Sequence, residues 1–378
     1  MKKILIFQMG DMAYSSTRVF AEELGKELER KDIAVEYFDA KKESPETLEA
    51  LAGKSFDAVI DFNSRLPGII KDEKGYLLDY IDAPFFNYIL DHPIYHHGNL
   101  EHQLKNYHVI SIDEGHTSYI KQWYPHIQSV QSFPIGAIQA QNIDKEKKDS
   151  HILFPATYLN PRDYYEMIGQ LPKMMKDTVL EIIDILLADT ACTYENAAMQ
   201  VYERSEQSMN FPLFAQSNFL ADIYVRAYFR EKVLETAANA GLPITVCGEK
   251  YQESRFVDYK NVTVLQEVSY RESIELIAQS AFVLNVMPWF KAGIHDRVLH
   301  AMRNRAVCIT DSSSLMQRYF TEQKDYIGYS LERLDDLPEQ LHKILSDTQK
   351  QYEIAESAAK KAEKMTFARQ AEFFASYI

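Results

Sequence analysis

The sequence predicts an α/β protein built from two doubly wound, Rossmann-like sheets. Short apolar runs alternate with segments of helical periodicity along the first 140 residues, and the alternation resumes after residue 243. Strands that alternate with helices form parallel sheets covered by helices on both faces. A chain of 378 residues is also long enough for two domains of ordinary size.

Six apolar runs in the first half are interpreted as strands. Residues 16–30 carry apolar side chains at helical spacing, and residues 46–53 suggest a second helix. The strands are expected at residues 3–8, 33–38, 56–62, 84–90, 108–112 and 127–133. The charged run at 141–150 lacks such a pattern and is a candidate linker. We therefore expect a first Rossmann-like domain over residues 1–145.

A fresh apolar run at 151–155 opens a second domain, expected over residues 151–350. Residues 162–240 are mostly helical in pattern and form an insertion. Strands are then expected at 243–247, 262–266, 281–286, 306–310 and 326–329. Helices are expected at 270–279, 294–304, 313–320 and 335–346, with one last helix over about 350–375. The ligands of such domains bind at the carboxyl ends of the strands.

The composition argues against several classes of partner. Lys and Arg number 41 and Asp and Glu 55, which gives a net charge of −14 and argues against binding of nucleic acid or an anionic membrane. Three cysteines, no signal-peptide pattern and no apolar run of membrane length predict a cytoplasmic protein. Only 13 residues are glycine, so an anion site is expected to form without a glycine-rich loop.

The richest segment for chemistry follows the predicted strand at 281–286. A loop with Trp289 and Gly293 leads to a helix predicted to begin near Ile294, which places His295 and Arg297 at its N-terminus. Helix N-termini attract anions, whereas an arginine in the first turn is unfavourable for the helix itself. The pattern indicates a phosphate site, and the alternative is a surface turn with a stray arginine.

The same segment carries a family resemblance. Gly-x-His-Asp-Arg at 293–297, Val-Leu-His-Ala-Met at 298–302 and Ala-Val-Cys-Ile-Thr-Asp at 306–311 resemble the donor-binding segment of GT-B glycosyltransferases. More narrowly, the segment is similar to the CgeB-like family, whose second domain resembles the glycosyl transferases group 1 domain. The strand at 151–157, the helix and strand over 226–248 and the strand–helix–strand over 262–285 agree with it. The resemblance covers about 151–345.

The resemblance implies a GT-B fold in which the second domain binds the donor, the first domain faces the acceptor, and a last helix at 351–378 crosses back to the first domain. Residues that hold the donor diphosphate would be Gly293, His295 and Arg297, with Thr157 near the phosphates. Asp296 would cap the helix or touch the sugar. Residues near the nucleoside would be Gly248 and Glu249, and those near the base Val268 and Tyr270.

The sequence departs from the family in one respect. Many retaining members of the broader superfamily have a glutamate at the position of His300 and a glycine at the position of Arg305. The paired glutamates of that superfamily are therefore absent, and either Glu249 or Asp311 would have to replace the missing carboxylate. The stereochemistry of transfer stays open.

Two segments offer a general base. Asp91 and His92 follow the strand at 84–90, and an inverting transferase needs such a group to deprotonate its acceptor. The alternatives are a zinc site that His92 shares with His96, or a polar loop with structural histidines. Asp11, after the first strand, is a second candidate for the base, with a simple turn as the alternative.

The predicted function is transfer of a sugar from a nucleotide-diphosphate sugar to an unidentified glycan, protein or small-molecule acceptor. The sequence has no Walker A, GxSxG, HExxH or Asp-x-Asp motif. We therefore expect no cofactor and no metal, with a helix N-terminus, arginine and histidine stabilising the diphosphate. The alternatives are a nucleotide-sugar epimerase and a non-catalytic nucleotide-sugar-binding protein.

Overall fold

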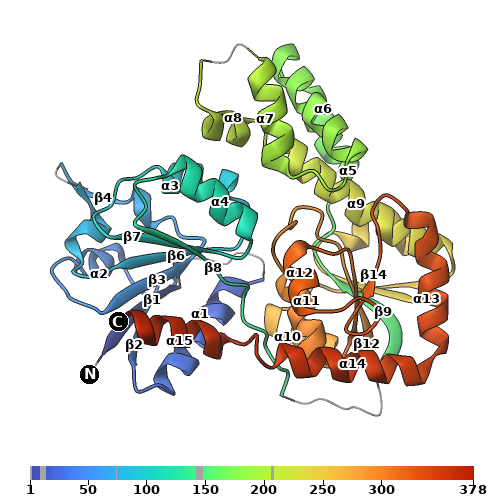
Figure 1. The fold of residues 1–378 in the computed structure, drawn as a ribbon. Helices are drawn as coiled ribbons and strands as arrows, with labels where there is room; N and C mark the ends of the chain where they lie inside the picture. Colours follow the sequence, from blue (N-terminus) through green and yellow to red (C-terminus); the bar gives the residue numbers. More distant parts are fainter. Residues whose placement is uncertain (1, 9–13, 74, 142–147, 206–207) are drawn as a thin grey trace. The chain divides into compact units, whose positions relative to one another are not determined.

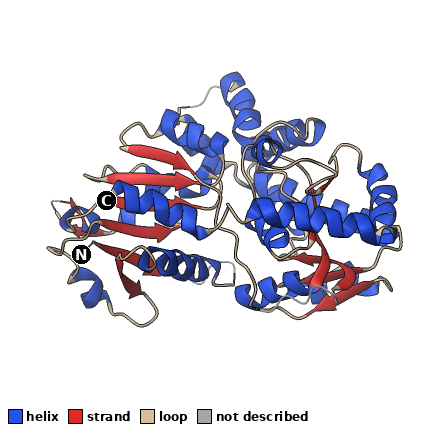
Figure 2. Ribbon diagram, turned by 60° about the horizontal axis from the view of Figure 1, so that its bottom comes forward, coloured by secondary structure: helices blue, strands red, loops and turns tan. Residues whose placement is uncertain are grey.

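A computed structural model describes residues 2–8, 14–73, 75–141, 148–205 and 208–378 (Figure 1). It divides the chain into two compact units. Unit 1 comprises residues 1–138 and 364–378, and unit 2 comprises residues 139–363. The described residues of each unit form one six-stranded parallel sheet. Helices flank both sheets (Figure 2). The predicted α/β fold class with two Rossmann-like sheets is thus confirmed.

The sheet of unit 1 has the strand order β2-β1-β3-β6-β7-β8, with every pairing parallel. Its strands are β1 (Lys3–Gln8), β2 (Ala34–Asp39), β3 (Ala58–Phe62), β6 (Phe85–Ile89), β7 (Tyr107–Ser111) and β8 (Ser129–Ser132). Its helices are α1 (Ser16–Glu29), α2 (Pro45–Glu49), α3 (His97–Leu100), α4 (Glu114–Trp123) and α15 (Phe367–Tyr377). The strand order reverses direction between β1 and β3, which makes their carboxyl ends the place where such sheets bind ligands.

The sheet of unit 2 has the order β11-β10-β9-β12-β13-β14 and is also parallel. Its strands are β9 (Asp149–Pro155), β10 (Ile244–Cys247), β11 (Val262–Leu265), β12 (Ser280–Asn285), β13 (Val307–Thr310) and β14 (Ile327–Gly328). The strand order reverses between β9 and β12. The loops that follow these two strands therefore flank the place where parallel sheets of this kind bind ligands.

Between β9 and β10 the described residues form five helices, which make up the predicted insertion. They are α5 (Pro161–Gly169), α6 (Lys173–Ala188), α7 (Tyr194–Arg204), α8 (Phe211–Ser217) and α9 (Leu220–Asn239). The remaining helices of unit 2 are α10 (Tyr270–Gln279), α11 (Asp296–Arg303), α12 (Ser314–Tyr319), α13 (Leu337–Ser346) and α14 (Thr348–Ala362). None of the helices in the described ranges has the length and apolar character that a membrane span needs.

The expectation of one last helix over 350–375 is wrong, because two helices occupy this region. The chain leaves α14 after Ala362, and α15 begins at Phe367. The backbone between them is held by the amide of Ala137, which donates to the carbonyl oxygen of Met365 at 2.7 Å. A Cβ atom on Gly136 would lie 2.4 Å from the amide nitrogen of Phe367, so a glycine is needed for this close approach.

Helix α15 packs within unit 1, against α1 and the sheet. The ring of Phe374, which is fully buried, meets the ring of Phe86 edge-on at a centroid distance of 5.1 Å. Burying one such side chain contributes roughly 1.5–3 kcal/mol to folding, and the edge-to-face pair adds about 0.5–1.5 kcal/mol. A second difference from the sequence-based expectation is a short antiparallel pair, β4 (Ile70–Asp72) and β5 (Gly75–Tyr76), which the apolar pattern did not indicate.

Candidate functional site

The predicted phosphate segment lies at the carboxyl edge of the second sheet. Strand β12 ends at Asn285, and α11 begins at Asp296 with His295 as its N-cap. The Nδ1 atom of His295 accepts from the amide of Arg297 at 3.2 Å and lies 2.6 Å from a carboxylate oxygen of Asp296. His295 holds the N-cap position, but Oδ1 of Asp296 also accepts from the amide of Arg297, at 2.8 Å, so both side chains contribute to capping α11. Burial lowers the pKa of His295, which favours the neutral imidazole.

Arg297 is buried, with 8% of its surface exposed. Its Nε atom donates to the carbonyl oxygen of Pro155 at 2.9 Å, and its Nη1 atom donates to Oδ1 of Asn285 at 2.8 Å. The guanidinium also lies 5.3 Å from the ring centroid of Phe154. The alternative of a surface turn with a stray arginine is thus wrong. Arg297 bridges the ends of β9 and β12, at the point where the strand order reverses.

Two further arginines join this edge from α9. Arg226 and Arg230 lie one turn apart, and their guanidinium carbons stand 4.9 and 4.8 Å from the ring centroid of Trp289. Burial lowers the pKa of Arg230 most, and the nearby charges of Arg297 and Arg226 lower it further, to about 9. The Nε atom of Arg230 is buried and has no hydrogen-bond partner among the described residues. Arg226, Arg230 and Arg297 are called the arginine cluster below.

Asp222 partly balances the charge of Arg226, because its Oδ2 atom lies 2.5 Å from Nη2 of Arg226, so the cost of the arginine cluster without a ligand falls mainly on Arg230. Like charges that approach within a buried site repel one another, and a buried N–H without a partner costs about 1–3 kcal/mol. An anion that accepts from these groups would remove both penalties. The sequence reasoning did not single out Arg226 and Arg230, because an i,i+4 arginine pair on a helix is also typical of a solvated face.

The loops after β9 and β10 meet beside the arginine cluster. Gly248 has φ +149°, and a Cβ atom there would lie 2.3 Å from the carbonyl oxygen of Ala156. The amide of Tyr158 donates to the carbonyl oxygen of Glu249 at 3.0 Å. Thr157 lies between Ala156 and Tyr158 in this loop. The structure therefore brings Thr157, Gly248 and Glu249 to the edge that also carries Gly293–Arg297.

Replacing Gly248 by alanine should destabilise unit 2, because the substituent would meet the backbone of Ala156 and strain the positive φ. We expect a loss of about 1–3 kcal/mol in the free energy of unfolding. The control is Gly169→Ala at the end of α5, where a Cβ atom has nothing within 4 Å. Urea titrations of both variants test this prediction, and equal stabilities would show that the two loops do not need this close contact.

Tyr270 and Val268 follow β11. Tyr270 begins α10, and its hydroxyl hydrogen-bonds to Asp296 and, at 2.8 Å, to Nε2 of His300. Burial and the Asp296 carboxylate raise the pKa of Tyr270, so the hydroxyl stays protonated and donates. Burial lowers the pKa of His300 to about 4. Tyr270 therefore ties α10 to the start of α11, while Val268 lies half-buried in the preceding loop. Contact of either residue with a base stays a prediction.

Asp311, one of the two possible replacements for the missing carboxylate, is 5% exposed. It accepts from the amide of Met287 at 2.8 Å, and burial raises its pKa to about 6. These contacts give it a structural role in joining the ends of β12 and β13. Glu249, the other possible replacement, is exposed at the end of β10.

In unit 1, Asp91 and His92 follow β6 as expected. The Oδ2 atom of Asp91 accepts from Nδ2 of Asn63 at 2.8 Å. His92 is only 2% exposed, and its Nδ1 atom accepts from the amide of Ile94 at 3.2 Å, capping a 3₁₀ helix. Its ring packs 4.5 Å from that of His116. Asp91 is thus the more accessible of the two candidates for the base.

The remaining candidate residues in unit 1 are His96, for a zinc site, and Asp11, for the base. His96 is 6% exposed, and burial lowers its pKa to about 4. Across the described residues, no group of three or more histidine, cysteine, aspartate or glutamate side chains is arranged to hold a metal ion. The zinc alternative for His92 and His96 therefore has no support there. Asp11 lies outside the described residues.

Comparison with known proteins extends these observations. Residues 226–376 match the family model described as glycosyl transferase-like, while no curated protein matches the sequence. An α-glucosyltransferase solved with UDP superimposes with a TM-score of 0.59 at 12% identity, over 99% of this chain and 100% of that chain. The chain has the GT-B glycosyltransferase fold. The resemblance drawn from residues 293–311 is thereby confirmed.

Further solved structures with the GT-B fold also superimpose on this chain. Sucrose-phosphate synthase from Thermosynechococcus elongatus superimposes with a TM-score of 0.54 at 10% identity, covering 100% of this chain and 98% of that chain. TarM gives a TM-score of 0.51 at 11% identity, covering 85% of this chain and 54% of that chain. The α-glucosyltransferase has also been solved with DNA, with a TM-score of 0.58 at 12% identity and a coverage of 99% of this chain and 100% of that chain. The expectation that nucleic acid is no partner is therefore not supported for this GT-B fold.

Proposed function

We propose that this chain transfers a sugar from a nucleotide-diphosphate sugar held by unit 2 to an acceptor. The observation that carries the proposal is the arginine cluster beside the N-terminus of α11, in which Nε of Arg230 is buried without a hydrogen-bond partner among the described residues. A diphosphate would accept from these groups and balance their charge. UDP-glucose is the first donor to test, because an α-glucosyltransferase of this fold has been solved with it.

The arginine cluster would act on the leaving group. In transfer, the bond between the anomeric carbon and the β-phosphate oxygen breaks and its electron pair stays on that oxygen. The acceptor oxygen bonds to the carbon, and its proton passes to a base or to the departing diphosphate. Arg230, with a pKa of about 9, carries its charge at neutral pH and can stabilise the oxygen as negative charge develops. The Nδ1 atom of His295 is occupied at the start of α11, so Nε2 is the ring nitrogen that would meet a phosphate, and it would donate only when it carries a proton.

The same charges lead us to propose a reaction without a metal ion. The guanidinium groups of Arg230 and Arg297, together with a helix N-terminus, would supply the positive potential that a divalent cation supplies in other transferases, while Arg226 is paired with Asp222. We expect release of UDP from UDP-glucose to proceed at the same rate with EDTA as with added Mg²⁺ or Mn²⁺. Loss of release in EDTA and its recovery with a divalent cation would contradict this part of the proposal.

Asp91 is our proposed base if the reaction inverts the anomeric configuration. One carboxylate oxygen is held by Asn63, and the carboxyl end of β6 positions the group at the ligand-binding edge of the first sheet. The buried His92 would support the loop through its cap at Ile94. Proton NMR of the product gives the anomeric configuration, and a retained configuration would remove the need for this base.

A nucleotide-sugar panel tests the activity as a whole. Each sugar is first examined by thermal shift and then incubated with the enzyme, with and without glycan, protein, small-molecule and DNA acceptors, while NMR follows the donor. Transfer releases free nucleotide together with a new glycoside, and slow hydrolysis releases nucleotide and free sugar. An epimer without nucleotide release would instead identify an epimerase, and binding without any change would identify a non-catalytic binder.

A further inference from the structure

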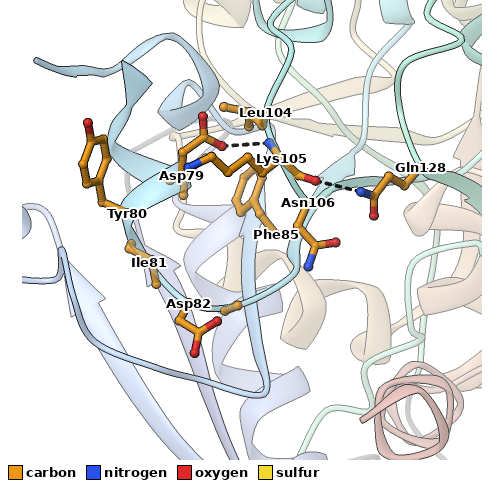
Figure 3. Close-up of a pocket in the computed structure, with 11 residues that line it drawn as sticks. Asp79, Tyr80, Ile81, Asp82, Phe85, Leu104, Lys105, Asn106 and Gln128 are labelled. Carbon is orange, nitrogen blue, oxygen red and sulfur yellow. Dashed lines mark hydrogen bonds between the residues drawn. The ribbon is translucent and has the colours of Figure 1, made fainter. Parts of the chain in front are cut away.

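A polar groove lies at the amino-terminal edge of the first sheet, the edge opposite Asp91. Its main cavity has a volume of about 590 Å³ and lies where β6, β7 and β8 begin (Figure 3). A second cavity of about 380 Å³ shares Gln128 with the first and continues along β8. The polar and aromatic side chains of the main cavity are those of Asp79, Tyr80, Asp82, Lys105, Asn106 and Gln128. Both cavities lie within unit 1.

The rim of the groove is fixed by hydrogen bonds to the backbone of Lys105. Its amide donates to Oδ1 of Asp79 at 2.8 Å, and its carbonyl oxygen accepts from Nε2 of Gln128 at 2.7 Å, as the dashed lines of Figure 3 show. The segment before β7 is therefore anchored to the segments before β6 and β8. A groove with such a rim is largely formed before a ligand arrives, which lowers the entropic cost of binding.

Several polar atoms of the groove have a hydrogen-bonding position that no other described residue occupies. Gln128 uses Nε2 for the rim, which leaves Oε1 as an acceptor. Asn106 uses Oδ1 toward Nε2 of His108 at 2.9 Å, which leaves the other end of its amide. Asp82 accepts from the hydroxyl of Ser55 through Oδ2 at 3.1 Å, which leaves Oδ1. The cavity thus combines donors and acceptors over an apolar floor that includes Phe85.

We propose that this groove binds a carbohydrate chain. Two carboxylates against one ammonium disfavour a phosphate-bearing ligand, whereas carboxylates and amides pair well with the hydroxyl groups of a sugar. The two adjoining cavities suit a ligand longer than one sugar residue. The groove and Asp91 are separated by the five residues of β6, roughly 16 Å along the strand. If the chain is the acceptor or product, which rests on the proposed function, the groove would hold its distal part.

A glycan array followed by calorimetry tests this proposal. The full chain is applied to an array of neutral, amino and acidic oligosaccharides, and the best-bound one is then titrated into the wild type and into the double variant Asp82→Asn/Asn106→Ala. We expect the dissociation constant to rise about tenfold or more in the double variant. The control is Gln103→Ala, an exposed amide beside the groove that does not line it, and its affinity should not change.

Failure of this proposal and failure of the proposed function give different results. If the wild type binds no glycan on the array, or if the double variant binds the glycan as tightly as the wild type, the groove does not bind carbohydrate as proposed. A titration with UDP in the same experiments reports on unit 2, and circular dichroism with urea unfolding of the double variant shows whether unit 1 is folded. If glycan binds at the groove but UDP does not bind, the proposed donor site fails and the groove stands.

Discussion

Replacing Arg230 by methionine should weaken the binding of UDP by about tenfold to a hundredfold, the range expected when charge-assisted hydrogen bonds are lost. The same change should not lower the stability of the ligand-free protein. Arg230 is desolvated, lies near Arg226 and Arg297, and has a buried Nε atom without a hydrogen-bond partner among the described residues. Methionine keeps much of the volume against Trp289 and removes the repulsion.

The matched control for this prediction is Lys232→Ala. Lys232 lies two residues further along α9, is exposed and carries the same charge, so its loss tests whether net charge alone matters. Calorimetric titration gives the affinities, and urea unfolding gives the stabilities. Equal affinity for UDP in the Arg230 variant and the wild type would exclude Arg230 from the donor site. A large loss of stability would instead show that it has a structural role.

The second large effect concerns Asp61, a buried carboxyl group in β3. Asp61 is 2% exposed, and its Oδ1 atom accepts from the amide of Phe62 at 2.9 Å. Its Oδ2 atom is buried and has no partner in the described part of the chain. Burial raises the pKa of Asp61 from 3.8 to about 7. The folded state therefore binds a proton that the unfolded state has lost between these two pH values.

The sign of the pH dependence follows from this proton. Because the folded pKa is the higher one, Asp61 makes unit 1 less stable as the pH rises from about 4 to about 7, and the loss is complete above the folded pKa. A shift of this size corresponds to about 4 kcal/mol. We expect Asp61→Asn, which stays neutral, to stabilise unit 1 by up to that amount at pH 8 and by little at pH 4.

Urea unfolding of unit 1 at pH 4, 6 and 8 measures this effect, with Glu43→Gln as the control. Glu43 is exposed, so the loss of its charge should change stability little at any of these pH values. A difference between Asp61→Asn and wild type that does not grow with pH would show that Asp61 ionises normally in the folded protein.

The sheet strands could be predicted from the sequence because each is a short apolar run with few competing patterns. The run at 3–8, for example, is β1 with the same bounds. The break between α14 and α15 could not be predicted in this way. Residues 363–366 contain neither glycine nor proline, and the break is instead fixed by the contact of Met365 and Phe367 with Ala137 and Gly136, which are more than 200 residues away in sequence.

The residues of the candidate site also differ in whether the sequence alone could identify them. Gly293–Arg297 could be found because a strand, a loop and a helix N-terminus are visible in the sequence. Arg226 and Arg230 could not, since only the fold brings α9 to Trp289 and Arg297. The burial of His92 likewise depends on its packing against His116 from another segment. Local patterns therefore locate one loop of the site, and tertiary packing supplies the other charges.

The most direct test of the donor site is a crystal structure of the protein with UDP. The account predicts that the diphosphate lies at the N-terminus of α11, with a phosphate oxygen within hydrogen-bond distance of the Arg230 guanidinium and of a backbone amide in the first turn of the helix. A diphosphate bound elsewhere in unit 2, with Arg230 still lacking an anionic partner, would contradict it.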